Sequence, residues 1–66
     1  MSNDKLIEQL QILKSNYISY KSIADNTDIP TSTFYYYLRR SSFPYNARKR
    51  IEEYINKEYR EILEDE

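Results

Sequence analysis

Hydrophobic residues recur along most of the chain at intervals of three and four positions, the spacing of one face of an α-helix. The first such stripe consists of Leu6, Leu10, Leu13 and Tyr17. Polar residues that favour a helix N-terminus precede it. This pattern predicts an amphipathic helix over residues 4–16.

Three further helical segments follow. Residues 19–26 begin at Ser19, a favourable N-cap residue, and end before a run rich in turn-forming side chains. Pro30 and the hydroxyl residues after it are typical of a helix start, so we expect a third helix over residues 30–40. Beyond the second proline, apolar residues continue at helical spacing, which predicts one long helix over residues 44–63.

The composition supports an all-α fold. The chain of 66 residues contains no glycine, so it lacks the Asn-Gly pairs that favour β-hairpins and the Gly-rich loops that bind nucleotide phosphates. We predict a single compact domain of four helices that spans residues 1–66. Its expected core consists of Leu6, Leu10, Leu13, Ile23, Ala24, Ile29, Phe34, Leu38, Ile51 and Ile55.

Several functional classes are disfavoured by absent residue types. The chain has no cysteine and no histidine, which argues against zinc sites, thiolate nucleophiles and His-based acid/base catalysis. No apolar run approaches the length of a membrane span, and the N-terminus is too polar to begin a signal peptide. We therefore expect a cytoplasmic protein with no enzyme activity, no metal site, no cofactor and no membrane contact.

Charge is distributed unevenly although the net charge is only −1. Residues 29–50 carry five basic side chains and no acidic one, whereas residues 51–66 carry seven acidic and two basic side chains. One interpretation is local pairing of the basic residues with Glu52 and Glu53 one turn further on. The other is a surface that contacts nucleic acid, because the cations are interleaved with tyrosine, serine and threonine.

The run from Tyr20 to Leu38, YKSIADNTDIPTSTFYYYL, resembles the helix-turn-helix of lambda-repressor-like and Cro-like regulators. Ile23 and Ala24 match the apolar and small pair that lets the first helix of that motif cross the second closely. Ile29 matches the apolar residue after the turn, and Phe34 matches the buried anchor of the recognition helix. The resemblance is close over these residues and looser toward residue 55.

Two positions depart from the family pattern. Asp28 occupies the turn position at which the family usually has glycine, and Tyr20 stands where the family often has a phosphate-contacting glutamine. The family's usual fifth helix is expected to be missing or merged into the long helix over residues 44–63.

The resemblance implies that the N-terminal part of the helix over residues 30–40 meets base edges in the major groove. The base-contacting candidates are Thr31, Ser32, Tyr35, Tyr36 and Arg39. The phosphate-contacting candidates are Lys21, Arg40, Tyr45, Arg48, Lys49 and Arg50. A packing role for one of the three consecutive tyrosines, Tyr37 in particular, is expected as well.

These features predict a small sequence-specific regulator that binds double-stranded DNA as a homodimer. The apolar residues of the last helix are expected to extend beyond what a small core can cover, which makes them dimer-interface candidates. They are Ile55, Tyr59, Ile62 and Leu63. The alternative is a helix-turn-helix reused as a protein-binding module or inhibitor, because eight tyrosines and an acidic tail suit a protein partner.

Overall fold

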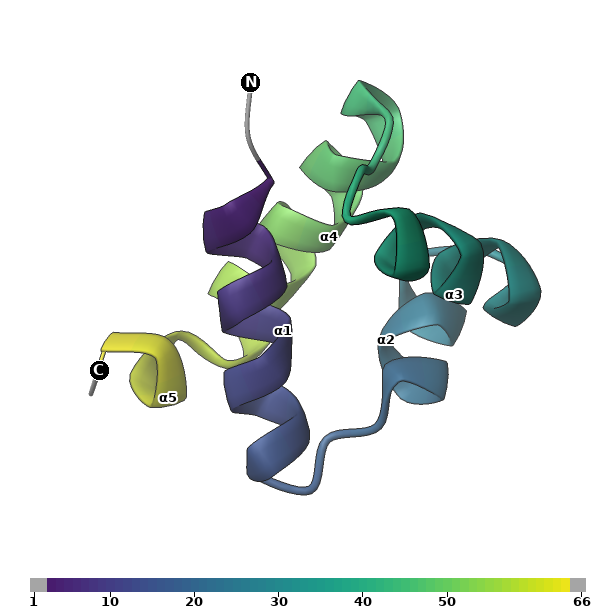
Figure 1. The fold of residues 1–66 in the computed structure, drawn as a ribbon. Coiled ribbons are helices and arrows are strands. Elements are labelled where there is room, and N and C mark those ends of the chain that lie inside the picture. The colour runs from purple at the N-terminus through teal and green to yellow at the C-terminus, as the bar shows by residue number, and fades with distance from the viewer. Residues whose placement is uncertain (1–2, 65–66) are drawn as a thin grey trace.

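The computed structural model describes residues 3–64, and within that range the chain is helical and contains no strand (Figure 1). The helices are α1 (Asp4–Ser15), α2 (Tyr20–Asn26), α3 (Thr31–Arg40), α4 (Tyr45–Glu58) and α5 (Arg60–Glu64). The predicted all-α fold is confirmed, and α1, α2 and α3 begin and end within one residue of their expected bounds.

The prediction of one long final helix is wrong. The chain leaves the helical conformation at Tyr59, where φ is −127° and ψ is 26°, and α5 follows as a separate short helix. Figure 1 shows α5 beside α1. The break lets Tyr59, Ile62 and Leu63 pack against the core as half-buried residues, whereas a straight continuation of α4 would carry them away from it.

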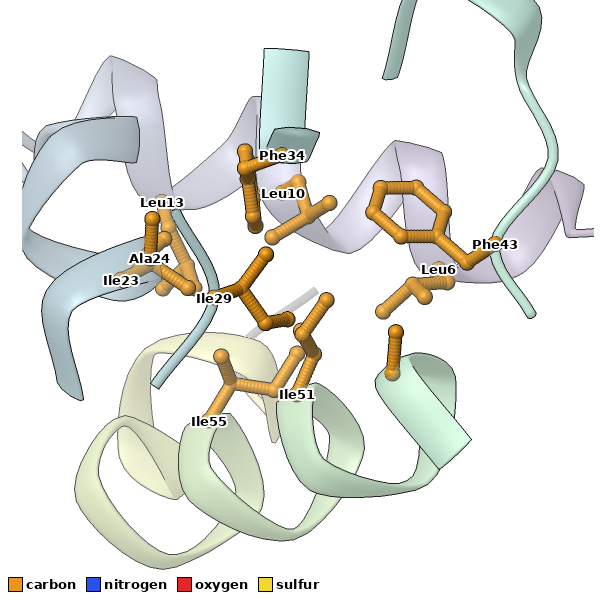
Figure 2. Packing of buried hydrophobic residues seen from close by; sticks show 11 residues of the cluster. Leu6, Leu10, Leu13, Ile23, Ala24, Ile29, Phe34, Phe43, Ile51 and Ile55 are labelled. Carbon is orange, nitrogen blue, oxygen red and sulfur yellow. The ribbon is translucent and has the colours of Figure 1, made fainter. Parts of the chain in front are cut away.

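The core lies between α1, the α2–α3 pair and α4 (Figure 2). Side chains from these elements point toward one another around Phe34, which is fully buried. The buried apolar residues are Leu6, Leu10, Leu13, Ile23, Ala24, Ile29, Phe34, Phe43, Ala47, Ile51 and Ile55. Every predicted core residue is therefore buried except Leu38, which is half-buried against the same cluster.

Phe43 is the largest core residue that the helical pattern missed. It lies in the connection between α3 and α4, where no helical spacing exists to reveal it. Its ring packs edge-on against Phe34 and against Tyr37, with both pairs of ring centroids 5.7 Å apart. This contact fixes the path of the chain from α3 to α4, and it also half-buries Tyr37, as expected.

Three helices end on a residue with left-handed backbone conformation although the chain has no glycine. These residues are Tyr17 (φ 69°), Asp28 (φ 60°) and Ser41 (φ 56°). After α2, the amide of Asp28 donates to the carbonyl of Asp25 and the amide of Ile29 donates to the carbonyl of Ala24. These two bonds form the Schellman arrangement, in which an apolar residue after the left-handed one turns inward.

The same arrangement explains why Tyr17 does not belong to the apolar stripe of α1. The amide of Tyr17 donates to the carbonyl of Lys14, and the amide of Ile18 donates to that of Leu13. Ile18 therefore turns toward the core, and the side chain of Tyr17 is 98% exposed. The helical spacing stops applying one residue after α1 ends.

Candidate nucleic-acid interface

Helices α2 and α3 pack against each other and are joined by the short turn over residues 27–30. Ser19 begins α2 as predicted, because its hydroxyl accepts a hydrogen bond from the amide of Ser22 at 3.1 Å. Thr27 is buried at the end of α2, and its hydroxyl donates to the carbonyls of Ile23 (2.8 Å) and Ala24 (3.1 Å). These bonds satisfy a buried polar group and fix the direction in which α3 leaves.

The outer face of α3 carries four exposed residues in one stripe. Ser32, Tyr35, Tyr36 and Arg39 occupy positions i, i+3, i+4 and i+7, which share one side of a helix. Phe34 lies on the opposite side and anchors α3 in the core. The structure thus brings four of the five base-contacting candidates together, whereas Thr31 is half-buried at the first residue of the helix.

The ring of Tyr35 on α3 packs edge-on against the ring of Tyr20 on α2. Their ring centroids are 5.9 Å apart with an interplanar angle of 77°, and Tyr35 also packs edge-on against Phe34. Lys14 places its ammonium group 4.8 Å from the centroid of the Tyr20 ring. Burial, and then the proximity of Tyr35, raises the pKa of Tyr20.

Tyr20 therefore has a positioning role that the sequence did not reveal. Tyr20 occupies the position at which the family that the chain resembles often has glutamine. In this chain its ring packs against the exposed Tyr35 of α3. The only sequence signal was an aromatic residue in the first turn of a short helix, which is not specific enough to indicate this contact.

Tyr36 is paired with Arg40 on the same side of α3. The Nη1 atom of Arg40 donates to the Tyr36 hydroxyl at 3.2 Å, and the guanidinium carbon lies 5.5 Å from the ring centroid. Tyr36 remains 48% exposed. Because a guanidinium has five N–H donors, this bond leaves Arg40 with donors that can meet phosphate.

The basic residues at the start of α4 have protein partners of their own. Arg48 lies 4.0 Å from Glu52 and Lys49 lies 3.8 Å from Glu53, so the local pairing considered from the sequence does occur. Such surface pairs contribute little to stability and are screened by salt. The remaining basic residue, Arg50, donates to the carbonyl of Thr27 at 3.2 Å.

The other candidates for DNA contact differ in the partners that their side chains have within the protein. Lys21 pairs with Asp25 at 3.1 Å within α2. Tyr45 is 62% exposed, and the guanidinium carbon of Arg48 lies 5.6 Å from its ring centroid. The side chain of Arg39 is exposed and forms no hydrogen bond or ion pair with another residue in 3–64. Arg39 is the one charged side chain among the base-contacting candidates, and no partner within these residues neutralises it.

The dimer-interface candidates lie differently from the sequence expectation. Ile55 is fully buried in the core of the monomer, so its assignment to an interface is corrected. Tyr59, Ile62 and Leu63 are half-buried where α5 meets the core, which leaves part of each side chain at the surface. The ring of Tyr59 packs edge-on against Tyr54, with centroids 5.8 Å apart, and this contact joins α5 to α4.

No cluster of histidine, cysteine, aspartate or glutamate with the geometry of a metal site occurs in the part of the chain that the structure describes. Among the same residues, no helix combines the length and the apolar character needed to cross a membrane.

Comparisons with known proteins add no relative from which a function could be carried over. No protein-family model matches the chain, and neither the curated proteins nor the solved structures contain a match to it.

Proposed function

We propose that this protein is a small sequence-specific DNA-binding regulator that places α3 in the major groove. The observation that carries the proposal is the exposed stripe Ser32, Tyr35, Tyr36 and Arg39 on the second helix of a helix-turn-helix. In such motifs that helix enters the groove and its outward side chains meet the base edges. Thr31 lies at the N-terminal end of the same helix and is the fifth base-contacting candidate.

The charge pattern supports the same surface. Residues 29–50, which include all of α3, contain five basic side chains and no acidic one. Phosphates attract such a surface at long range, and neutralising them releases counterions from DNA. The proposed phosphate contacts are Lys21, Arg40, Tyr45, Arg48, Lys49 and Arg50.

The ion pairs of Arg48 and Lys49 with glutamates do not oppose this proposal. Both pairs are at or near the outer limit of an ion pair, at 4.0 Å and 3.8 Å. The Lys49 pair is exposed, and the Arg48 side chain is 24% exposed. Exposed pairs of this kind contribute about 0–1 kcal/mol. A phosphate that approaches the start of α4 can therefore compete for these cations at low cost.

A homodimer is part of the proposal. One short recognition helix covers only one half-site, and regulators of this type double their contact by binding two half-sites one helical turn apart. The partly exposed side chains of Tyr59, Ile62 and Leu63 are the proposed contact between the two copies.

A second candidate function is binding of a protein partner. The observation that favours it is that Tyr17 and Tyr45, which are 98% and 62% exposed, lie outside the α3 stripe. Exposed tyrosine is enriched at interface hot spots. A stable complex that forms without DNA would support this alternative.

The deciding experiment measures binding to duplex DNA by fluorescence anisotropy over a series of salt concentrations. If each monomer neutralises about four phosphates, a dimer should show a slope of log K against log salt of roughly −7. Lys49→Gln should flatten the slope by about 2 units per dimer, because one contact is lost in each copy. The matched control is Lys57→Gln, which removes the same charge at the far end of α4. Absence of salt-dependent duplex binding would overturn the proposal.

A further inference from the structure

The α3 stripe has an unusual chemistry for a surface that reads DNA. Strong discrimination between base pairs comes from side chains with two adjacent hydrogen-bonding atoms, such as arginine with guanine and asparagine or glutamine with adenine. Residues 31–38 contain none of these side chains and no charged one. Arg39, in the last turn of α3, is the first side chain along the helix that could form such a bidentate contact.

The side chains that remain are hydroxyls and two aromatic rings. The Ser32 hydroxyl can donate or accept, so it pairs with any base and discriminates weakly. Tyr35 and Tyr36 occupy the centre of the stripe and are 42% and 48% exposed. The middle of the reading surface therefore consists of two aromatic rings, each of which carries one hydroxyl group.

Thymine presents one apolar group in the major groove, the methyl group on C5. No other base of unmodified DNA presents a comparable group there. Two tyrosine rings at the centre of the stripe can cover thymine methyl groups and remove them from water, which is favourable in proportion to the area buried.

The two rings are already ordered before DNA binds. Tyr35 packs against Tyr20 and Phe34, and Tyr36 is held by Arg40 through a hydrogen bond and a cation–π contact. Side chains that are fixed in advance lose less conformational entropy on binding.

The same contacts argue against stacking on unpaired bases. Stacking of that kind requires an open ring face on which a base can lie. The guanidinium of Arg40 lies over one face of Tyr36, and Tyr20 and Phe34 meet the ring of Tyr35. Arg40 therefore leaves Tyr36 at most one face for a base, whereas a methyl group needs only part of a ring.

We infer that the protein recognises a half-site whose central base pairs are A·T, and that Tyr35 and Tyr36 read their thymine methyl groups. Arg39 meets the outer edge of that half-site. This inference rests on the proposed binding to duplex DNA and adds the class of sequence that is bound.

The test begins with selection of a preferred duplex from a random library. Deoxyuridine then replaces each thymidine of that duplex, which removes the methyl group and leaves every hydrogen-bonding atom unchanged. Dissociation constants are measured by fluorescence anisotropy. Removing each contacted methyl group should weaken binding about fourfold, as expected for the loss of one buried carbon group.

Protein variants assign the effect to the tyrosines. In Tyr35→Ser and in Tyr36→Ser, the dissociation constants for the thymidine and deoxyuridine duplexes should become equal at one position of the site. The ratio of the two dissociation constants is taken within one variant, so that a loss of overall affinity cancels. Tyr17→Ser is the matched control, because it removes an exposed tyrosine that lies outside α3 and outside the proposed DNA contacts, and it should leave the difference intact. Circular dichroism confirms that each variant is folded.

The outcomes separate this inference from the proposed function. If the selected duplex binds equally well with deoxyuridine, the methyl readout is overturned while DNA binding stands. Preference for the single strand over the duplex would overturn it in favour of base stacking. If no duplex binds at all, the proposed function and this inference fail together.

Discussion

The Nη1 atom of Arg50 donates a hydrogen bond of 3.2 Å to the backbone carbonyl of Thr27. This contact joins α4 to the residue that caps the C-terminus of α2, where unpaired carbonyls favour a positive charge. Arg50 therefore braces the turn that directs α3. Arg50 is predicted from the sequence to contact phosphate, and the structure shows that it also has a contact within the protein. Its contact with phosphate remains a prediction.

Replacement of Arg50 by methionine should destabilise the fold by about 1 kcal/mol, since it removes one charge-assisted hydrogen bond at a partly buried site. Urea unfolding followed by circular dichroism measures the change. Lys49→Met is the control, because it removes one charge from the neighbouring, exposed residue of α4. Equal stability of the two variants would show that the Arg50 contact does not support the fold.

Truncation of Phe34 should have a much larger effect. Phe34→Ala leaves a cavity at the centre of the core and should cost about 3–5 kcal/mol. That loss is comparable to the whole stability of a domain of this size, so the variant should melt far below the wild type or be unfolded at 25 °C. Thermal unfolding checks it, with Tyr45→Ala as an exposed aromatic control. A melting temperature close to that of the wild type would contradict the central position of Phe34.

Much of this fold follows from the spacing of apolar residues. The stripes through Leu10 and Ile51 repeat over several helical turns, so each pattern specifies both a helix and its buried face. The spacing of apolar residues does not predict the roles of Phe43 and Tyr59. Phe43 lies in a loop, and Tyr59 lies at a helix break within a continuous apolar pattern. Residues 58–60 include no proline or glycine, so the local sequence gives no signal that the helix breaks there.

The candidate site divides in the same way. The stripe on α3 follows from sequence, because positions opposite a buried anchor must face outward. The contacts between Tyr20 and Tyr35 and between Arg50 and Thr27 depend on how helices cross. Sequence spacing does not encode crossing geometry at the level of single side chains, so these roles required the structure.

Tyr17 offers a test of backbone strain. Its φ of 69° places a bulky residue in a conformation that asparagine adopts more readily, and its side chain is 98% exposed. Tyr17→Asn should therefore stabilise the protein by about 1 kcal/mol. Urea unfolding measures the change, and Tyr45→Asn, in which an exposed tyrosine at an ordinary backbone position is replaced, should give no such gain. A destabilised Tyr17→Asn protein would mean that the tyrosine side chain supports the fold.

Tyr54 should make the stability dependent on pH in the alkaline range. Its burial, and then its hydrogen bond to Tyr59, raises the pKa of Tyr54 from 10.0 to about 12. The two hydroxyl oxygens are 3.4 Å apart. Because the pKa is higher in the folded chain, the neutral phenol stabilises the fold fully below pH 10. This contribution is lost as the pH rises from 10 toward 12.

Tyr54→Phe removes the ionisable group and should reduce the loss of stability over that interval. Urea unfolding at a series of pH values between 8 and 12 measures the effect relative to the wild type. In the control variant Tyr45→Phe, the exposed tyrosine lies outside the α4–α5 contact, so the alkaline decline should match that of the wild type. If Tyr54→Phe declined as steeply as the wild type, ionisation of Tyr54 would not be the cause.

The last prediction concerns the homodimer. Recognition helices that bind successive half-sites lie about 34–36 Å apart, whereas the longest extent of this chain is 28 Å. The two copies must therefore meet on a side away from α3. Figure 1 places α3 and α5 on opposite sides of α1, so a contact through α5 satisfies this requirement.

Sedimentation at micromolar concentration should accordingly show a dimer, and Ile62→Glu should weaken it by placing a charge among the partly exposed apolar side chains of α5. Because Ile62 also packs against the core, its thermal unfolding is measured alongside, and a folded monomer is the expected result. Glu61→Gln changes an exposed neighbour on α5 and should leave the dimer intact. A wild-type protein that stays monomeric at every concentration, both free and on a two-half-site duplex, would rule out the two-fold arrangement. The α3 stripe would then have to bind a single half-site alone.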